Sequence, residues 1–186
     1  MHKIISYTII FILFFTLSTF SQNSSLIDPP PLTLDEIQVN EFKIGIRYDE
    51  QLAIKNFGKM TSKAERATDN VNEESTDFQI YFIDAYMDVK NSKVQAIGII
   101  SPKPKLPRGI GVGDNFFSLF KTYGNPKKMT IAQQDIETDI LFKPETGFIC
   151  QYSSKGNQGE VIIYFILDDN GIIQTIFIEG YGGIEI

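Results

Sequence analysis

The longest apolar run of the chain lies at its start and extends from Ile4 to Leu17. Lys3 precedes the run, and small residues follow it at Thr19 and Ser21. A positive charge, a short apolar segment and small residues before a cleavage point are typical of a secretory signal peptide. The run is shorter than the ~20 residues that a membrane-spanning helix needs. We therefore expect cleavage after residue 21 and no membrane span in the mature chain.

Downstream, apolar residues recur with the spacing of one helical face, at Phe116, Leu119, Phe120 and Tyr123. Asp114 is the expected N-cap, and Gly124 is the expected C-terminal stop. A second and less apolar helix is expected over residues 50–57. The polar stretch 59–76 is compatible with either helix or loop.

Strand patterns occur in both halves of the chain. In the first half they predict strands at 78–84 and 94–100. In the second half they predict strands at 139–143, 147–152, 160–167 and 172–179. The segment 168–171, which ends in Asn-Gly, predicts a hairpin turn. Short connections of this kind indicate antiparallel pairing.

A weak internal repeat links the two halves. Ile44-Gly45-Ile46 precedes Phe57-Gly58 with the same spacing with which Ile110-Gly111-Val112 precedes Tyr123-Gly124. The sequence Ile-Tyr-Phe-Ile occurs at 80–83 and again at 163–166, and the segments 91–97 and 170–176 are also similar. Three matches in the same order predict two related structural units.

The fold class expected from these patterns is α+β, with two tandem units that each consist of a helical segment followed by an antiparallel β-sheet. The expected organisation is a signal peptide (1–21), a Pro-containing tether (22–36), a first unit (37–102), a linker (103–106) and a second unit (107–186). The linker is placed where three prolines fall within seven residues, because proline interrupts both helices and central strands.

Composition excludes several classes of chemistry. The only histidine is His2, in the expected signal peptide, and Cys150 is the only cysteine. Catalytic systems that pair Ser or Cys with His are therefore excluded in their usual forms, as are zinc sites built from His and Cys. The chain has 23 acidic against 17 basic residues and a net charge of −6. This balance disfavours nucleic acid as a partner.

The remaining polar motifs have structural explanations. The glycine-rich segment 109–114 lacks the preceding strand of a dinucleotide fingerprint, so a tight entry into a helix is expected. The acidic turn 168–171 does not fit the spacing of a calcium loop. Lys127, Lys128 and Arg108 are expected to be solvated loop charges. Cys150 is expected to be a buried, unreactive thiol on a strand. No catalytic residue, cofactor or metal site is predicted.

Three tyrosines are the candidate binding residues: Tyr81, Tyr152 and Tyr164. Tyr81 and Tyr164 occupy matching positions in the repeated Ile-Tyr-Phe-Ile, and Tyr152 lies on a neighbouring expected strand. A sheet face that presents Tyr and Ile is typical of a protein-recognition surface. The alternative is that these faces are covered by helices or by the other unit.

The segment 110–114, the amphipathic helix after it and Tyr123-Gly124-Asn125-Pro126 together resemble a segment of beta-lactamase-inhibitor-protein-like domains. The small outer-membrane assembly lipoproteins share that helix-plus-sheet architecture. The resemblance implies an exported domain that acts by binding rather than by catalysis. This chain differs from the lipoproteins in one respect, because no Cys directly follows the apolar run. No binding residue can be transferred from these families.

The sequence thus predicts a periplasmic or secreted protein-binding module, of inhibitor or immunity type, whose partner is another protein. A non-catalytic role is favoured over an enzymatic one. Two alternatives stay open: a His-independent hydrolase that uses two carboxylates, and a structural component of the cell envelope.

Overall fold

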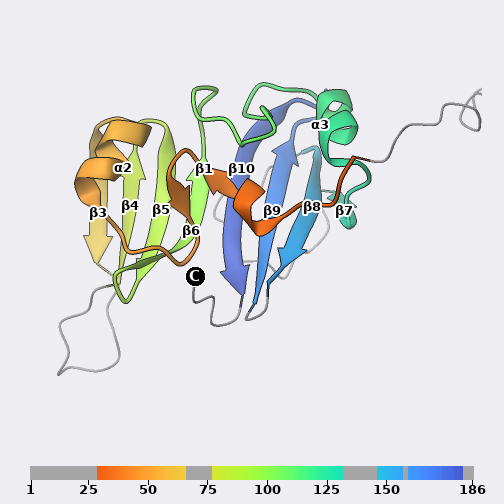
Figure 1. Cartoon of the computed structure of the whole chain (residues 1–186). Helices are drawn as coiled ribbons and strands as arrows, with labels where there is room; N and C mark the ends of the chain where they lie inside the picture. Colours follow the sequence, from red (N-terminus) through yellow and green to blue (C-terminus); the bar gives the residue numbers. More distant parts are fainter. Residues whose placement is uncertain (1–28, 66–76, 132–145, 157–158, 182–186) are drawn as a thin grey trace, which may run out of the picture.

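A computed structural model describes residues 29–65, 77–131, 146–156 and 159–181. The expected signal peptide and the expected strand at 139–143 lie outside these residues. The main feature is one eight-stranded antiparallel sheet with the order β3-β4-β5-β6-β10-β9-β8-β7 (Figure 1). Its strands are β3 (Met60–Glu65), β4 (Phe78–Phe82), β5 (Ala85–Lys90), β6 (Lys93–Ile99), β7 (Lys128–Ile131), β8 (Phe148–Lys155), β9 (Glu160–Leu167) and β10 (Ile173–Tyr181).

The other elements pack on one face of this sheet. They are the short 3-10 helix η1 (Leu34–Glu36), a small hairpin of β1 (Gln38–Val39) and β2 (Phe42–Lys43), and the helices α2 (Glu50–Phe57) and α3 (Phe116–Tyr123). Buried residues from the helices and the hairpin form one continuous core with the sheet, among them Phe42, Phe57, Leu119, Ile163 and Phe165. We call this side the helix-covered face.

The prediction of an α+β fold built from two tandem helix-plus-sheet units is wrong. The protein is mostly β, with two helices of eight residues each in the described part of the chain. The chain order of one helix and then four strands occurs twice. However, the last strands of the two sets, β6 and β10, pair directly, with Ile97 opposite Ile178 and Ile99 opposite Ile176. The two expected sheets are therefore one sheet.

The repeat matches do not all fall on corresponding elements. Gly58 and Gly124 each end a helix, and the segments 91–97 and 170–176 each include the turn that leads into a central strand. The two copies of Ile-Tyr-Phe-Ile differ, because one belongs to β4, the second strand of its set, and the other to β9, the third. Tyr81 and Tyr164 are therefore not structurally equivalent.

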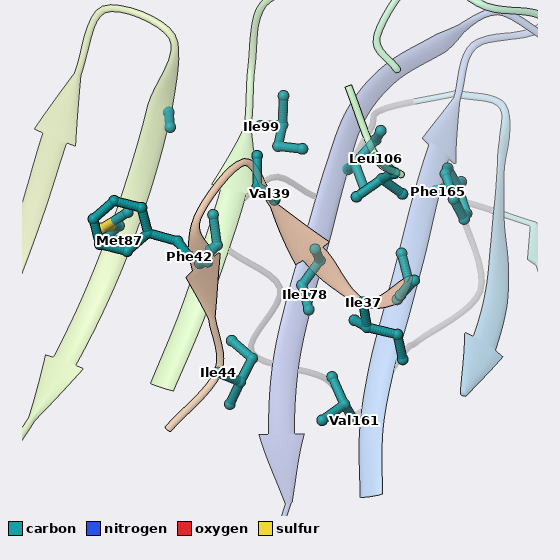
Figure 2. Packing of buried hydrophobic residues seen from close by; sticks show 14 of the residues in the cluster. Ile37, Val39, Phe42, Ile44, Met87, Ile99, Leu106, Val161, Phe165 and Ile178 are labelled. Atoms are coloured by element: carbon teal, nitrogen blue, oxygen red, sulfur yellow. The ribbon is translucent and has the colours of Figure 1, made fainter. Parts of the chain in front are cut away.

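The N-terminal segment, which we define as residues 29–44, crosses the helix-covered face from the side of α3 toward the side of α2 (Figure 1). Its four buried residues are Ile37, Val39, Phe42 and Ile44. Figure 2 shows these side chains over the central strands, beside Ile99 and Ile178. The segment therefore covers the junction at which the two sets of strands meet.

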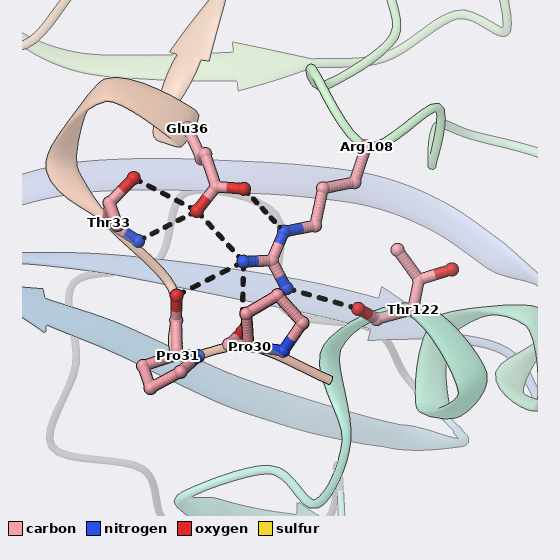
Figure 3. A network of polar contacts seen from close by, with 6 residues as sticks. All are labelled: Pro30, Pro31, Thr33, Glu36, Arg108 and Thr122. Carbon is pink, nitrogen blue, oxygen red and sulfur yellow. Dashed lines mark hydrogen bonds and ion pairs between the residues drawn. The ribbon is translucent and has the colours of Figure 1, made fainter. Parts of the chain in front are cut away.

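Arg108 holds the start of this segment (Figure 3). Its Nε and Nη2 atoms each donate a hydrogen bond of 2.8 Å to the Glu36 carboxylate. The guanidinium also donates to the carbonyl oxygens of Pro30, Pro31 and Thr122, at 3.0, 3.1 and 3.2 Å. The Arg108 side chain is only 11% exposed. The expectation that Arg108 is a solvated loop charge is wrong.

Candidate binding surface

Tyr152 lies on the helix-covered face and belongs to the core. It is 5% exposed, and its ring centroid is 5.5 Å from that of Tyr123 and 5.6 Å from that of Phe165. Its hydroxyl donates a 2.9 Å hydrogen bond to the Gly124 carbonyl oxygen, just after α3. Burial raises the pKa of this hydroxyl. These contacts give Tyr152 a structural role in anchoring the end of α3.

Tyr81 and Tyr164 lie on the opposite face of the sheet. Tyr81 is half-buried and packs against Tyr86, with ring centroids 5.0 Å apart. Tyr164 is 4% exposed and packs near Phe177 at 6.3 Å. Burial and hydrogen bonding with Glu179 raise the pKa of Tyr164. The three predicted binding residues therefore do not share one surface, and two of them are buried.

The exposed large apolar side chains identify a different candidate binding surface. In the described part of the chain they are Ile83, Ile100, Phe117, Met129, Ile131 and Tyr181. Three of them, Phe117, Met129 and Ile131, belong to α3 and to β7. The helical spacing in the sequence predicted α3 but not the exposure of Phe117, and no pattern marked β7.

The start of α3 explains why Phe117 is exposed. The Asn115 side chain caps the helix by accepting a 2.9 Å hydrogen bond from the Ser118 backbone N–H. Phe116 turns toward the sheet, where its ring meets Phe148 edge-on at 5.8 Å. The next helical residue points about 100° further around the axis. Phe117 therefore points away from the sheet, and it is 83% exposed.

The position of β7 explains the exposure of Met129 and Ile131. In its pairing with β8, Met129 lies opposite Cys150 and Ile131 lies opposite Phe148. Opposite residues in an antiparallel pair point to the same side. Both side chains thus point to the helix-covered side, but β7 is the last strand in the sheet order. Met129 is 53% exposed and Ile131 is 58% exposed.

A surface hollow of about 410 Å³ adjoins Phe117. It is lined by Asn115, Phe116, Phe117, Phe148, Asp169, Asn170 and Gly171. One wall is the turn between β9 and β10, where the Asn-Gly pattern predicted a hairpin. The Asp168 carboxylate accepts hydrogen bonds of 2.9 Å from the backbone N–H groups of Asn170 and Ile172. The Phe116 N–H donates to the Gly171 carbonyl oxygen at 2.7 Å, which joins the turn to α3.

We call this region the α3–β7 surface and define it by Phe116, Phe117, Met129, Ile131 and Phe148, together with the hollow. It is continuous, because Phe148 contacts Phe116 on one side and pairs with Ile131 on the other. Lys121 on α3 and Lys128 on β7 belong to the elements that form it and are both exposed.

A second hollow, of about 420 Å³, is more polar. It is lined by Pro31, Leu32, Tyr123, Asn125, Lys127, Tyr152, Ser153, Ser154 and Lys155. Lys127 donates to Glu160 at 2.8 Å and to Ser153 at 3.2 Å. The hydrogen bond from Lys127 lowers the pKa of Glu160. Neither hollow is lined by two carboxylates, so neither supplies the pair that a His-independent hydrolase needs.

The glycine-rich entry to α3 is occupied by the chain itself. The Asp114 carboxylate accepts a 2.8 Å hydrogen bond from the Gly111 N–H and a 2.7 Å bond from Lys105. The described residues contain no group of three or more His, Cys, Asp or Glu that could hold a metal ion. Cys150 is fully buried in a strand, as predicted, and burial raises its pKa to about 11.

Comparisons with known proteins give little further information. No protein-family model matches the chain, and no curated protein matches it. A crystal structure of a DUF4309 family protein (YjgB) from Bacillus subtilis aligns with 86% of this chain and 92% of its own. The sequence identity is 11% and the TM-score is 0.35, a similarity that assigns neither fold family nor function. In the described residues, no helix has the length and apolar character required to cross a membrane.

Proposed function

We propose that this protein is an exported protein-binding module that docks its partner on the α3–β7 surface. The observation that carries the proposal is the 83% exposed ring of Phe117 on α3, together with the exposed side chains of Met129 and Ile131 on the edge strand β7. Soluble proteins rarely expose contiguous apolar patches without a binding role. Aromatic residues and methionine are also enriched at protein–protein interfaces.

The shape of the surface supports a protein partner. It joins an exposed helix residue, a sheet edge and a hollow with both aromatic and polar walls. Binding energy at interfaces concentrates in a few large side chains that insert into pockets on the partner. Phe117 is the obvious anchor of this kind, and the hollow next to it can receive an anchor from the partner. The proposal of export rests on the apolar run at the start of the chain. The role proposed for the bound state is that of an inhibitor or an immunity-type protein, which occupies another protein.

The test compares substitutions of matched exposure. A partner is first captured from the envelope fraction of the source cells and purified, and its affinity is then measured by titration calorimetry. Phe117→Ser and Ile131→Ser should each weaken binding by about 1–4 kcal/mol, the range for interface anchors. Ile83→Ser is the control, because Ile83 and Ile131 are both 58% exposed and Ile83 lies in the turn between β4 and β5.

The control should bind as the unmodified protein does, and all three variants should keep its melting temperature. If Phe117→Ser binds with unchanged affinity, or if Ile83→Ser loses as much affinity as Ile131→Ser, the α3–β7 surface is not the docking site.

A further inference from the structure

The two edges of the sheet differ in a way that concerns the partner. In the described part of the chain, the sheet ends in β3 on one side and β7 on the other. The exposed residues of β3 include Lys63 and Glu65, and its pairing with β4 is shifted by an irregularity between Met60 and Ser62. Charges and bulges of this kind protect an edge against pairing with another chain.

The β7 edge is protected less than β3, because it has no bulge and Lys128 is its one charged residue. Its register with β8 is regular from Lys128 to Ile131, and it carries no acidic residue. An edge strand directs the backbone N–H and C=O groups of alternate residues away from its neighbour. An extended segment of a partner can therefore pair with β7 and add a ninth strand to the sheet. Strand addition of this kind is a common mode of peptide recognition.

The side chains of β7 specify what such a segment must carry. Residues placed opposite Met129 and Ile131 would point to the helix-covered side, where the apolar surface continues through Phe148 to Phe117. Lys128, which precedes Met129, points to the other side and is exposed. Neither Lys128 nor Lys121 has an ion-pair partner in the described residues, although the chain as a whole has a net charge of −6.

From this geometry we infer that the partner presents an extended segment with alternating apolar and acidic residues, which pairs with the β7 edge. Its apolar side chains pack beside Met129 and Ile131, and an acidic side chain faces Lys128. This inference rests on the proposed function and adds the form and charge of the bound element.

The test uses synthetic peptides and NMR shifts of the backbone amides of the intact protein. The probe is a short peptide in which valine and glutamate alternate. At millimolar concentration it should shift the amides of β7 and leave those of β3 unchanged. Two further peptides carry N-methyl groups on every second backbone nitrogen, either at the valines or at the glutamates, and these are the two phases. Only one of the two sets faces β7. Methylation of that set should weaken binding about tenfold or more, because it removes the strand-pairing hydrogen bonds.

Charge reversal tests the acidic preference. Lys128→Glu should weaken binding of the Val-Glu peptide, and a Val-Lys peptide should regain affinity for that variant. Each change should be about two- to fivefold, as expected for an exposed ion pair. Ala64→Glu on β3 is the control and should have no effect. Met129→Glu should weaken binding of both peptides.

Several results would overturn the inference. They are an absence of shifts at β7, insensitivity to N-methylation in both phases, or loss of binding in Ala64→Glu. Self-association of the protein that Met129→Glu abolishes would instead assign the edge to a second copy of this chain. If these peptides fail while Phe117→Ser still weakens binding of the purified partner, the proposed function stands and only the strand-pairing mode is excluded.

Discussion

Gly58 and Gly124 show, at the scale of single residues, how backbone geometry limits substitution. They end α2 and α3 with φ of 79° and 74° and with ψ of −169° and −154°. The left-handed conformation that commonly ends a helix has a positive ψ. The observed combination of positive φ and extended ψ is essentially restricted to glycine. The sequence thus located both helix ends, and the observed conformation tolerates other residues even less than the left-handed one does.

Alanine at these two positions forms a matched pair of tests. Both substitutions should lower the free energy of unfolding by about 1–3 kcal/mol, because both place a side chain in the glycine-only region. A Cβ at Gly58 would meet nothing closer than 3.4 Å, whereas a Cβ at Gly124 would lie 3.1 Å from Pro29 Cγ. Gly124→Ala should therefore be the more destabilising of the two in urea unfolding. Unchanged stability in both variants would contradict the described backbone angles.

Burial at single positions was only partly predictable. The parity of Cys150 with Phe148 and Tyr152 correctly placed it on one side of a strand, because the two-residue period is a local property. Which side is covered is not local. Tyr152 is buried by α3, and Tyr164 is buried on the opposite face although it was expected on a binding surface. Arg108 gave no signal at all, because its partner Glu36 lies 72 positions away.

At the scale of elements, helices were easier to predict than strands. The helical spacing from Phe116 to Tyr123 and the stop at Gly124 are confirmed. The cap is Asn115 instead of Asp114, because the Asp114 carboxylate bonds to Gly111 and Lys105. The strands β3, β5 and β7 were missed. β5 follows β4 after only Ile83 and Asp84, without the glycine or asparagine that usually marks a hairpin. The edge strands β3 and β7 carry too few buried residues for a clear pattern.

The ion pair of Glu36, on the N-terminal segment, with Arg108 predicts that stability depends on pH. Hydrogen bonds from Arg108 are the largest cause that lowers the Glu36 pKa from 4.5 to about 2. A carboxylate with a lowered folded-state pKa stabilises the fold above its unfolded pKa, and this stabilisation disappears as the pH falls through the folded value. Glu36→Gln should therefore destabilise the protein at neutral pH. The stability difference from the unmodified protein should shrink as the pH falls from 4.5 toward about 2.

The measurement is urea unfolding of both proteins over that pH range. Asp35→Asn is the control, because Asp35 is 90% exposed and pairs with Lys43 at the surface. Its effect on stability should be small, since exposed ion pairs contribute little. A stability difference for Glu36→Gln that stays constant down to pH 2 would show that the carboxylate charge does not hold the segment.

At the scale of the whole molecule, the pairing of β6 with β10 decides the architecture. The apolar patterns of these strands indicate burial but do not identify the neighbouring strand, so the sequence could not distinguish two small sheets from one large sheet. Gly98 and Phe177, on the face opposite the helix-covered face, lie directly opposite each other in this pair. Their match is visible only once the strands are placed side by side. The resemblance to inhibitor-protein-like domains stays a prediction.

A continuous sheet predicts that the described protein unfolds as one cooperative unit. Ile178 is the position at which to test this, because it is 1% exposed and lies between Ile97 of β6 and Ile163 of β9. Ile178→Ala should cost about 2–5 kcal/mol, the usual range for deleting a buried aliphatic side chain. Hydrogen exchange should show the same loss of protection in β5 and in β9, on opposite sides of the junction, because global unfolding exposes both together. Two independent units would instead lose protection in β9 alone, and two separate thermal transitions would then be seen by calorimetry.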